Sequence, residues 1–343
     1  MARKVKLAVD REALKKLSLV VVAYSHVERE WFPTSDAYWA EVEVEDRSKE
    51  VEEKVKELGI EAKRLPGDQY FLTNLLVDKP DVVINLVDTL RGKDRLQTSV
   101  PAALELSNIP YTGAGMEGLV IGNNRNLTKR LLMAYDIPTP EFQFIRRVGV
   151  TIDEDILTPP LIVKLNESGG SVGIDNHAVK ETLVLAQKKV DKMIGTYKMP
   201  VVVEKFIDGP EITVVVFDDG TKMHVLMGQK IFRKKPDGKH YFTSSDSYDD
   251  ERAYKYTVVE EPLLGKIELL AKRAFRGLQH KDYAKFDVRV DEKTGTPYFT
   301  DSNPNTAFGP DTGLPLTEVF ALHGISFEEV ISSLLSKYAK NIV

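Results

Sequence analysis

Two continuous apolar runs in the first third of the chain, residues 17–24 and 81–87, restrict its fold most strongly. A strand that is apolar on both faces must be covered on both faces, as parallel strands in α/β sheets are. A helix is predicted between them from about Asp46 to Gly59, where apolar residues recur on one helical face. A second helix is predicted over 101–106. The pattern predicts an N-terminal open α/β sheet of the doubly wound kind.

The middle and last thirds follow a looser order. Helices are predicted over 126–134 and 180–194, with a strand over 160–165 and a glycine–serine loop over 167–173 between them. Strands over 201–207 and 211–217, separated by Asp-Gly-Pro, predict a hairpin. Residues 229–257 are predicted to form a long, lid-like loop. Further helices are predicted over 262–278 and 326–338, the latter with a capping box of Ser326 and Glu329.

Composition narrows the class of protein. A chain of 343 residues exceeds what one core usually organises, and we expect domains over 1–115, 116–198 and 199–343. Charged residues of both signs are interleaved, and the net charge is only -5, which argues against nucleic-acid partners. Absence of cysteine excludes disulfides and thiolate chemistry. Without a signal-like or bilayer-length apolar segment, a cytoplasmic protein with no membrane partner is expected.

The segment YAKFDVRVDEKTGTPYFTDSNPN carries a candidate cation site. Lys285, Asp287 and Arg289 point to one face of the first strand, opposite Ala284, Phe286, Val288 and Val290. In the return strand Phe299, Asp301 and Asn303 are predicted to share a face. A turn centred on Thr294 places Asp287 directly opposite Asp301. Two facing carboxylates and an amide match the oxygen ligands of Mg²⁺, although a solvated hairpin face balanced by Lys285 and Arg289 would give the same pattern.

Two further features indicate a nucleotide. The backbone of the 167–173 loop, ESGGSVG, can approach an anion closely, and Lys164 at the end of the preceding strand can add a charge; alone, such a loop is more often a turn. Glu204 and Glu211 interrupt the apolar stretch VVEKFIDGPEITVVV. An adenine amino group or ribose hydroxyls would satisfy these carboxylates, as would pairing with Lys205 or Lys222.

Taken in order, KPDVVINLVD, IPYTGAG, NLTKRLL, IPTP, PLIVKLNESGGSVGI and the two segments quoted above resemble the ATP-grasp superfamily, in its D-alanine:D-alanine ligase branch. The resemblance covers about residues 81–335. It implies a three-domain fold: an N-terminal open α/β sheet, a small central α+β domain and a C-terminal α+β domain with an antiparallel sheet. It also implies ATP and two magnesium ions as cofactors, amino acid or peptide-like substrates, and makes a homodimer plausible.

The resemblance also implies roles for individual residues. In the nucleotide site, Arg125 and Lys164 would hold phosphates under the Gly170–Ser171 loop, while Glu204, the backbone of Lys205 and Ile207, and Glu211 would bind adenine and ribose. The metal ligands would be Asp287, Asp301 and Asn303. The catalytic residues would be Lys285, facing the reacting carboxylate, Lys255, near the γ-phosphate, and Glu28, holding a substrate ammonium.

Several positions depart from the branch. Arg125 stands for a lysine, and Lys285 stands for an arginine, so a bidentate fork is lost there. Asp301 stands for a glutamate, which withdraws one metal ligand by a methylene. Gly170 stands for a serine, and an N-terminal glycine pair is replaced in the sequence before Glu28. The nucleotide side is thus better preserved than the substrate side.

The sequence therefore predicts an ATP-dependent carboxylate–amine ligase that works through an acyl phosphate and releases ADP and phosphate. Two alternatives stay open. One is a ligase of the same chemistry for another amino acid or peptide. The other is a nucleotide-binding module that has lost turnover, which the Asp301 and Lys285 replacements favour.

Overall fold

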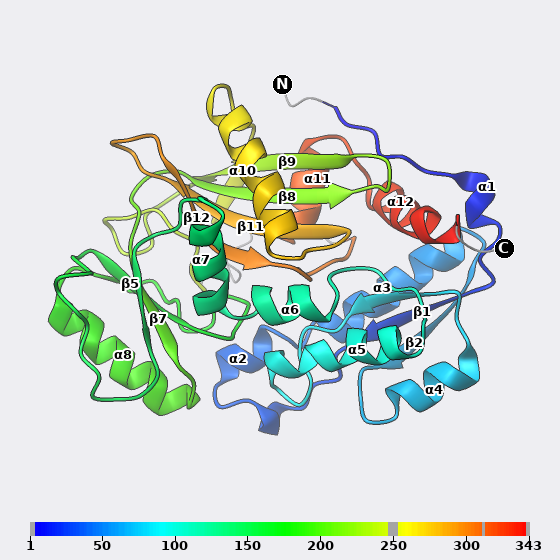
Figure 1. Cartoon of the computed structure of the whole chain (residues 1–343), viewed down its shortest axis with the longest axis horizontal. Helices are drawn as coiled ribbons and strands as arrows, with labels where there is room; N and C mark the ends of the chain where they lie inside the picture. The colour runs from blue at the N-terminus through cyan, green and yellow to red at the C-terminus, as the bar shows by residue number, and fades with distance from the viewer. Residues whose placement is uncertain (1–3, 246–252, 311–312, 341–343) are drawn as a thin grey trace.

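The computed structural model describes residues 4–245, 253–310 and 313–340. Within these residues the strands form three sheets, in the orders β2-β1-β3, β4-β7-β5-β6 and β10-β9-β8-β11-β12. The first sheet is parallel, and the other two are antiparallel. Figure 1 shows the sheet of β5 and β7 at one end of the molecule and the β1 sheet at the other, both below the β8–β9 sheet.

The N-terminal sheet has helices on both faces, as predicted for a doubly wound arrangement. Val20 and Val22 of β1 pack in the core that includes α3, whereas Val21 and Ala23 pack in the core that includes α4 and α5. The structure adds β2 and α4, which the sequence analysis did not find. The elements are β1 (Leu19–Tyr24), α3 (Val44–Glu57), β2 (Glu61–Pro66), α4 (Phe71–Asp78), β3 (Val82–Leu86) and α5 (Ser99–Leu106).

The central sheet carries one long helix. This helix, α8, packs on the apolar face of β5 and β7 through Ala186, Val190, Met193 and Ile194. The sheet is preceded by a helix that begins at Arg125, with Asn124 as its side-chain cap. The elements are α7 (Arg125–Ala134), β4 (Phe142–Ile145), β5 (Leu161–Leu165), β6 (Val179–Lys180), α8 (Leu183–Tyr197) and β7 (Val201–Lys205).

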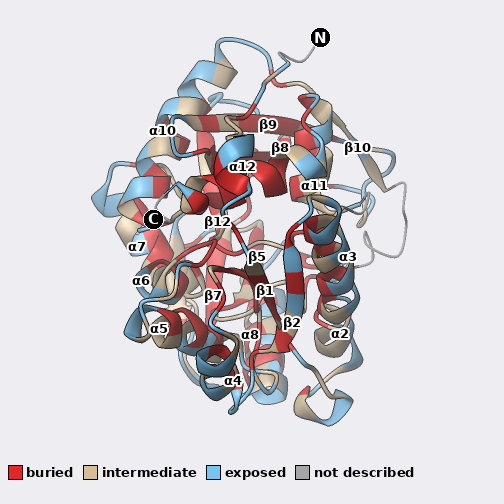
Figure 2. Cartoon of the chain, turned by 90° about the vertical axis from the view of Figure 1, so that its right-hand side faces the viewer, coloured by how far each residue is buried: buried red, intermediate tan, exposed pale blue. Residues whose placement is uncertain are grey.

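The C-terminal sheet is covered on both faces. Helix α10 packs on one face, and α11 and α12 pack on the other, in a core that continues into the N-terminal sheet. Figure 2 shows its central strands as buried. The elements are β8 (Glu211–Asp218), β9 (Met223–Phe232), β10 (Tyr254–Thr257), α10 (Leu263–Gly277), β11 (Tyr283–Val290), β12 (Pro297–Asn303), α11 (Pro315–Leu322) and α12 (Phe327–Ala339).

Two sequence predictions about this region are wrong. The predicted hairpin of 201–207 and 211–217 does not form, because β7 pairs with β4 and β5 while β8 pairs with β9 and β11. Asp208-Gly209-Pro210 instead connects the central sheet to the C-terminal sheet, because β7 and β8 each pair with strands that are distant in sequence. The predicted loop 229–257 is a strand at both ends, in β9 and β10, and its residues 246–252 lie outside the described residues.

The remaining short elements connect the sheets. They are α1 (Arg11–Leu14), η1 (Arg29–Trp31), α2 (Ser35–Trp39), η2 (Asp94–Thr98) and α6 (Met116–Gly122). Helix α1 packs against α12. Among the described residues no single helix is long and apolar enough to cross a membrane; the bent pair α11 and α12 passes on length and composition, and its apolar residues lie in the core. The domain limits at 115 and 198 stay a prediction.

Candidate active site

The β11–β12 hairpin places the predicted cation ligands. Asp287 pairs with Asp301, as the sequence predicted, and Lys285 pairs with Asn303. The register nevertheless differs near the turn, where Val288 pairs with Phe299. A β-bulge at position 300 absorbs the difference.

The bulge corrects one prediction. Phe299 does not share a face with Asp301, because it packs in the core with Phe286 and Val288. An extra residue in one strand reverses the alternation of side chains beyond it, so the core side chain and the polar side chain point to opposite faces.

Both aspartates are held by basic side chains. Lys285 Nζ lies 2.6 Å from Asp287 Oδ2, and Arg125 Nη2 lies 2.6 Å from Asp301 Oδ2. The Asn303 amide nitrogen lies 3.4 Å from Asp287 Oδ2. Burial opposes ionisation of Asp301, but the charges of Arg125 and other cations outweigh it and lower its pKa. The hairpin thus presents carboxylate oxygens beside positively charged side chains.

Arg125 links the hairpin to the glycine–serine loop. Its Nη1 atom donates to the backbone oxygens of Leu165 and Ser168, both at 2.6 Å. Gly170 of this loop has a φ of +57°, and a Cβ there would lie 2.7 Å from the Ala40 Cβ. The loop therefore lies against the residue that follows α2, and the central sheet reaches the N-terminal region at this point.

Glu204 and Glu211 are buried and paired. Glu204 forms ion pairs with Lys129 and Lys164. Glu211 lies 2.8 Å from Lys230 and 2.8 Å from Arg289. Burial opposes ionisation of Glu211, but these two cations outweigh it and lower its pKa to about 2. The carboxylates are thus satisfied by partners other than the Lys205 and Lys222 that the sequence analysis weighed.

Arg289 also reaches the segment after β7. Its Nε atom donates to the Ile207 backbone oxygen at 2.6 Å. The Lys205 backbone N–H donates to the Glu141 oxygen at 2.9 Å. These contacts fix the backbone of the segment that the resemblance assigns to adenine.

A cleft of about 1270 Å³ lies between the three sheets. The predicted site residues that line it are Arg125, Gly170, Lys255, Lys285, Asp301 and Asn303. The others, all of them described, do not line it: Glu28, Lys164, Ser171, Glu204, Lys205, Ile207, Glu211 and Asp287. The half-exposed carboxylate of Glu28 lies 3.5 Å from the His26 ring nitrogen Nε2.

Eight charged residues that line the cleft were missed by sequence reasoning: Asp36, Glu41, Glu43, Asp46, Arg47, Asp88, Asp94 and Glu318. Asp88 follows β3 at the carboxyl edge of the parallel sheet, where ligands of such sheets commonly bind, and this rule could have found it. Glu41 and Arg47 carry no comparable signal, because nothing in a helical pattern tells which polar residue faces a cleft.

These features define the class of protein: an ATP-grasp fold, in which a central and a C-terminal antiparallel sheet enclose a charged cleft. Solved structures agree. A D-alanine–D-alanine ligase from Bacillus anthracis complexed with ATP matches with a TM-score of 0.70 and 20% identity, over 94% of this chain and 98% of that one. The VanG D-Ala:D-Ser ligase of Enterococcus faecalis gives 0.67 and 15%, over 94% and 99%.

The sequence comparisons identify the family. A family model described as the D-Ala D-Ala ligase C-terminus matches residues 131–336. A D-alanine–D-alanine ligase from Polaromonas naphthalenivorans is 29% identical over 72% of this chain and 75% of its own length. The uncharacterised protein y4sG of Sinorhizobium fredii is 27% identical over 82% and 84%. The chain belongs to the D-alanine–D-alanine ligase family and is an ATP-dependent ligase.

Proposed function

We propose that this ligase joins the carboxylate of one amino acid or peptide to the amine of another, with ATP and Mg²⁺. The carboxylate oxygen forms a bond to the γ-phosphorus as the bond from that phosphorus to the ADP oxygen breaks. The amine then attacks the acyl carbon, phosphate leaves, and the amine loses a proton. Such steps depend mainly on positioning and on cations that spread developing charge. The observation that carries the proposal is the facing pair Asp287 and Asp301 beside Arg125 and Lys285.

The donor set of the hairpin fits Mg²⁺. Asp287, Asp301 and Asn303 offer only hard oxygen ligands from one sheet edge, which is what this ion prefers. When bound, the ion would neutralise the negative charge of the triphosphate. Arg125 and Lys285, which now neutralise the aspartates, would then be available to the phosphates and to the reacting carboxylate.

The remaining predicted residues are proposed to hold the nucleotide. Lys164 is fixed by Glu204 at the end of β5, so its charge is positioned before a phosphate arrives. The Gly170–Ser171 loop is proposed to cover the phosphates, and Lys255 on β10 faces the same cleft. The Lys205 to Ile207 backbone, with Glu204, is proposed to bind adenine, and Glu211 to bind ribose. Glu28 is proposed as a ligand of a substrate ammonium.

Removing a single hairpin ligand tests this proposal. Asp287→Ala and Asn303→Ala should each reduce phosphate release from ATP by about 100-fold or more, because an oxygen donor for the cation is lost. Glu292→Ala, at an exposed position of the same hairpin turn, is the matched control and should keep wild-type turnover. Unfolding midpoints should show that all three variants are folded. Turnover within a few-fold of wild type in the first two variants would refute the cation assignment.

A further inference from the structure

Three carboxylates and one guanidinium meet on the N-terminal side of the cleft. Glu41 follows α2, Asp88 follows β3 and Asp94 begins η2; we call these three the acidic cluster. Arg47 projects from α3 beside them. All four line the cleft, and each acts electrostatically on at least one of the others. The proposed function gives none of them a role.

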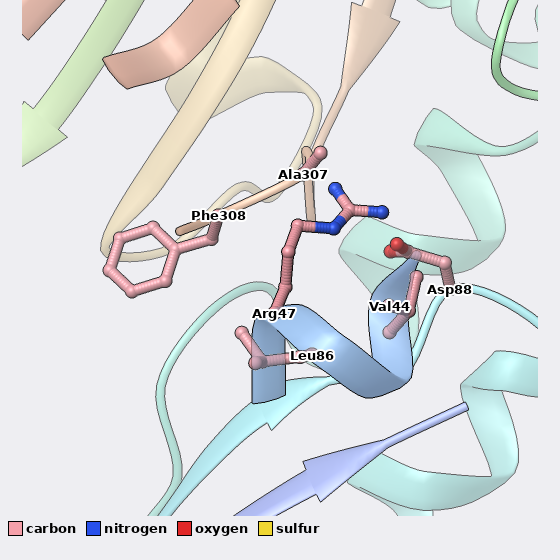
Figure 3. Close-up of a pocket in the computed structure, with 6 residues that line it drawn as sticks. All are labelled: Val44, Arg47, Leu86, Asp88, Ala307 and Phe308. Atoms are coloured by element: carbon pink, nitrogen blue, oxygen red, sulfur yellow. The ribbon is translucent and has the colours of Figure 1, made fainter. Parts of the chain in front are cut away.

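Arg47 faces the acidic cluster and favours the ionised forms of Glu41 and Asp88, but it forms no ion pair with them among the described residues. Figure 3 shows its guanidinium and the Asp88 carboxylate pointing toward one another across a small cavity. No ion pair within 4 Å joins them, or joins Arg47 to Glu41 or Asp94, in the part of the chain that the structure describes. Asp94 also accepts from the Gly169 N–H at 3.2 Å and is favoured in its charged form by Arg125. The acidic cluster and Arg47 together carry two negative charges in excess when all four side chains are ionised. Buried charge of one sign is costly unless a partner arrives.

Within this group of four side chains, one buried hydrogen-bond acceptor and one buried donor lack a hydrogen-bond partner among the described residues. Glu41 and Arg47 are only 9% and 7% exposed. The Glu41 Oε2 atom and the Arg47 Nε atom nevertheless form no hydrogen bond among the described residues. A buried donor and a buried acceptor without partners, at the wall of an open cleft, are groups that a ligand can satisfy.

The titration of the acidic cluster agrees with an unfilled cation site. Burial raises the pKa of Asp88 to about 7 and that of Asp94 to about 6. Burial, with the charges of Asp94 and Asp88, raises the pKa of Glu41 well above its usual value. A cation placed among them would favour the ionised forms.

The spacing of the three carboxylates favours an organic cation over a metal ion. No group of three or more acidic or histidine side chains in the described residues is close enough to hold a metal ion. An ion needs its ligands converging within about 2.6 Å. An ammonium or guanidinium group on a flexible chain can instead reach carboxylates that stand apart.

We propose that the acidic cluster and Arg47 select an amino acid or peptide substrate with a basic side chain. Arg47 would take its carboxylate, and the carboxylates of the acidic cluster, which a bound cation would hold in the ionised form, would take its α-ammonium and its side-chain cation. This inference rests on the proposed function and names its substrate class. It also assigns ammonium binding to the acidic cluster instead of Glu28.

Matched substrates test it. Arginine and citrulline have nearly the same shape but differ in charge, as do lysine and norleucine, which is only slightly shorter. Phosphate release with ATP and Mg²⁺ should be measured for both enantiomers of each, alone and paired with D-alanine. We expect kcat/KM for the basic member to exceed that for the neutral member by about 100-fold, because the neutral one leaves buried charges unpaired.

Isosteric variants assign the preference to the cluster. Glu41→Gln and Asp88→Asn should each reduce the arginine-over-citrulline ratio by about tenfold or more, mainly through KM. Glu53→Gln, an exposed position on α3 outside the cleft, removes the same charge and should leave the ratio unchanged. Calorimetric binding of arginine and citrulline to the wild type checks the preference without turnover.

The outcomes separate the two claims. Phosphate release with D-alanine but equal values for arginine and citrulline would overturn the basic-substrate inference and leave the ligase proposal standing. No phosphate release with any amino acid would overturn the proposed function instead. Tighter binding of arginine than citrulline in calorimetry would then still support the cluster as a cation site, and equal binding would reject it.

Discussion

The ionisation of Asp88, which lines the cleft, makes the free energy of unfolding depend on pH. Its pKa rises from 3.8 to about 7 because burial disfavours the charged form. The folded protein therefore binds this proton more tightly than the unfolded chain. Stability from the neutral carboxyl is present below about pH 4 and is lost as the pH rises through about 7. Arg47 opposes this loss, whereas Asp94 and Glu41 reinforce it.

Asp88→Asn should consequently become more stable relative to wild type as the pH rises from about 4 to about 7, because asparagine has no proton to lose. Urea unfolding at several pH values measures the difference. A difference that stays constant or changes in the opposite direction contradicts the buried, unneutralised state of Asp88. A basic amino acid at saturating concentration should reduce the effect.

Glu211 shows the opposite dependence. Its pKa falls from 4.5 to about 2, so its ionised form contributes stability above about pH 4.5 that disappears toward pH 2. Glu211→Gln leaves Lys230 and Arg289 without a buried counter-ion and should cost about 3 kcal/mol at neutral pH. The deficit should shrink below pH 4.5. In the exposed pair of Lys15 and Glu12, Glu12→Gln should give no measurable change; equal effects would argue against the buried network.

At the scale of elements, the connection between β7 and β8 is closely packed against the end of β11. Gly209 has a φ of +139°, and a Cβ there would lie 2.0 Å from the Val290 backbone oxygen. The Glu292 N–H donates to the Asp208 oxygen, and the Val290 N–H to the Pro210 oxygen, so the connection is bonded to the end of β11. No side chain fits without moving this junction.

Gly209→Ala should therefore destabilise the protein by about 3 kcal/mol, from backbone strain and the collision together. Gly295→Ala is the matched control, because Gly295 also has a positive φ, +64°, but has open space around it. Its cost should stay near about 1 kcal/mol. Guanidinium unfolding measures both variants. Equal losses of stability in Gly209→Ala and Gly295→Ala would contradict the prediction, because they would show that the backbone around Gly209 can move to accept a side chain.

At the scale of the whole molecule, the cleft joins all three sheets. Arg125, at the start of α7, donates to Asp301 of the C-terminal sheet. The loop at Gly170 packs against Ala40, which follows α2. A ligand in the cleft therefore contacts surfaces that are far apart along the chain and stabilises them together.

ATP with Mg²⁺ at about 100 times its dissociation constant should raise the free energy of unfolding by about 2.7 kcal/mol. EDTA should remove most of this gain, because the triphosphate would then face Asp287 and Asp301 without a neutralising ion. Differential scanning calorimetry measures the shift. A gain that survives EDTA would show that the hairpin carboxylates hold no ion in the complex.

Much of the fold could be predicted from local sequence patterns. The face of Val51 and Val55 in α3 and the alternation in β11 each have a period that only one kind of element matches. The apolar run at β1 has the length and the β-branched residues of a buried strand. The pairing of Asp287 with Asp301 was also within reach of hairpin arithmetic, although the bulge at Thr300 was not. Ligands from neighbouring strands are predictable because local geometry places them.

The chain alone determined the family motifs, the hairpin that bears the candidate metal ligands, and two of the three strands of the first sheet, β1 and β3. Only the tertiary structure decided that β7 and β8 belong to different sheets and that Glu41, Arg47, Asp88 and Asp94 share one wall of a cleft. The physical reason is the separation along the chain over which each kind of interaction acts. Periodicity and turn chemistry act over a few residues, whereas sheet partners and the meeting of separate side chains depend on packing between segments distant in sequence.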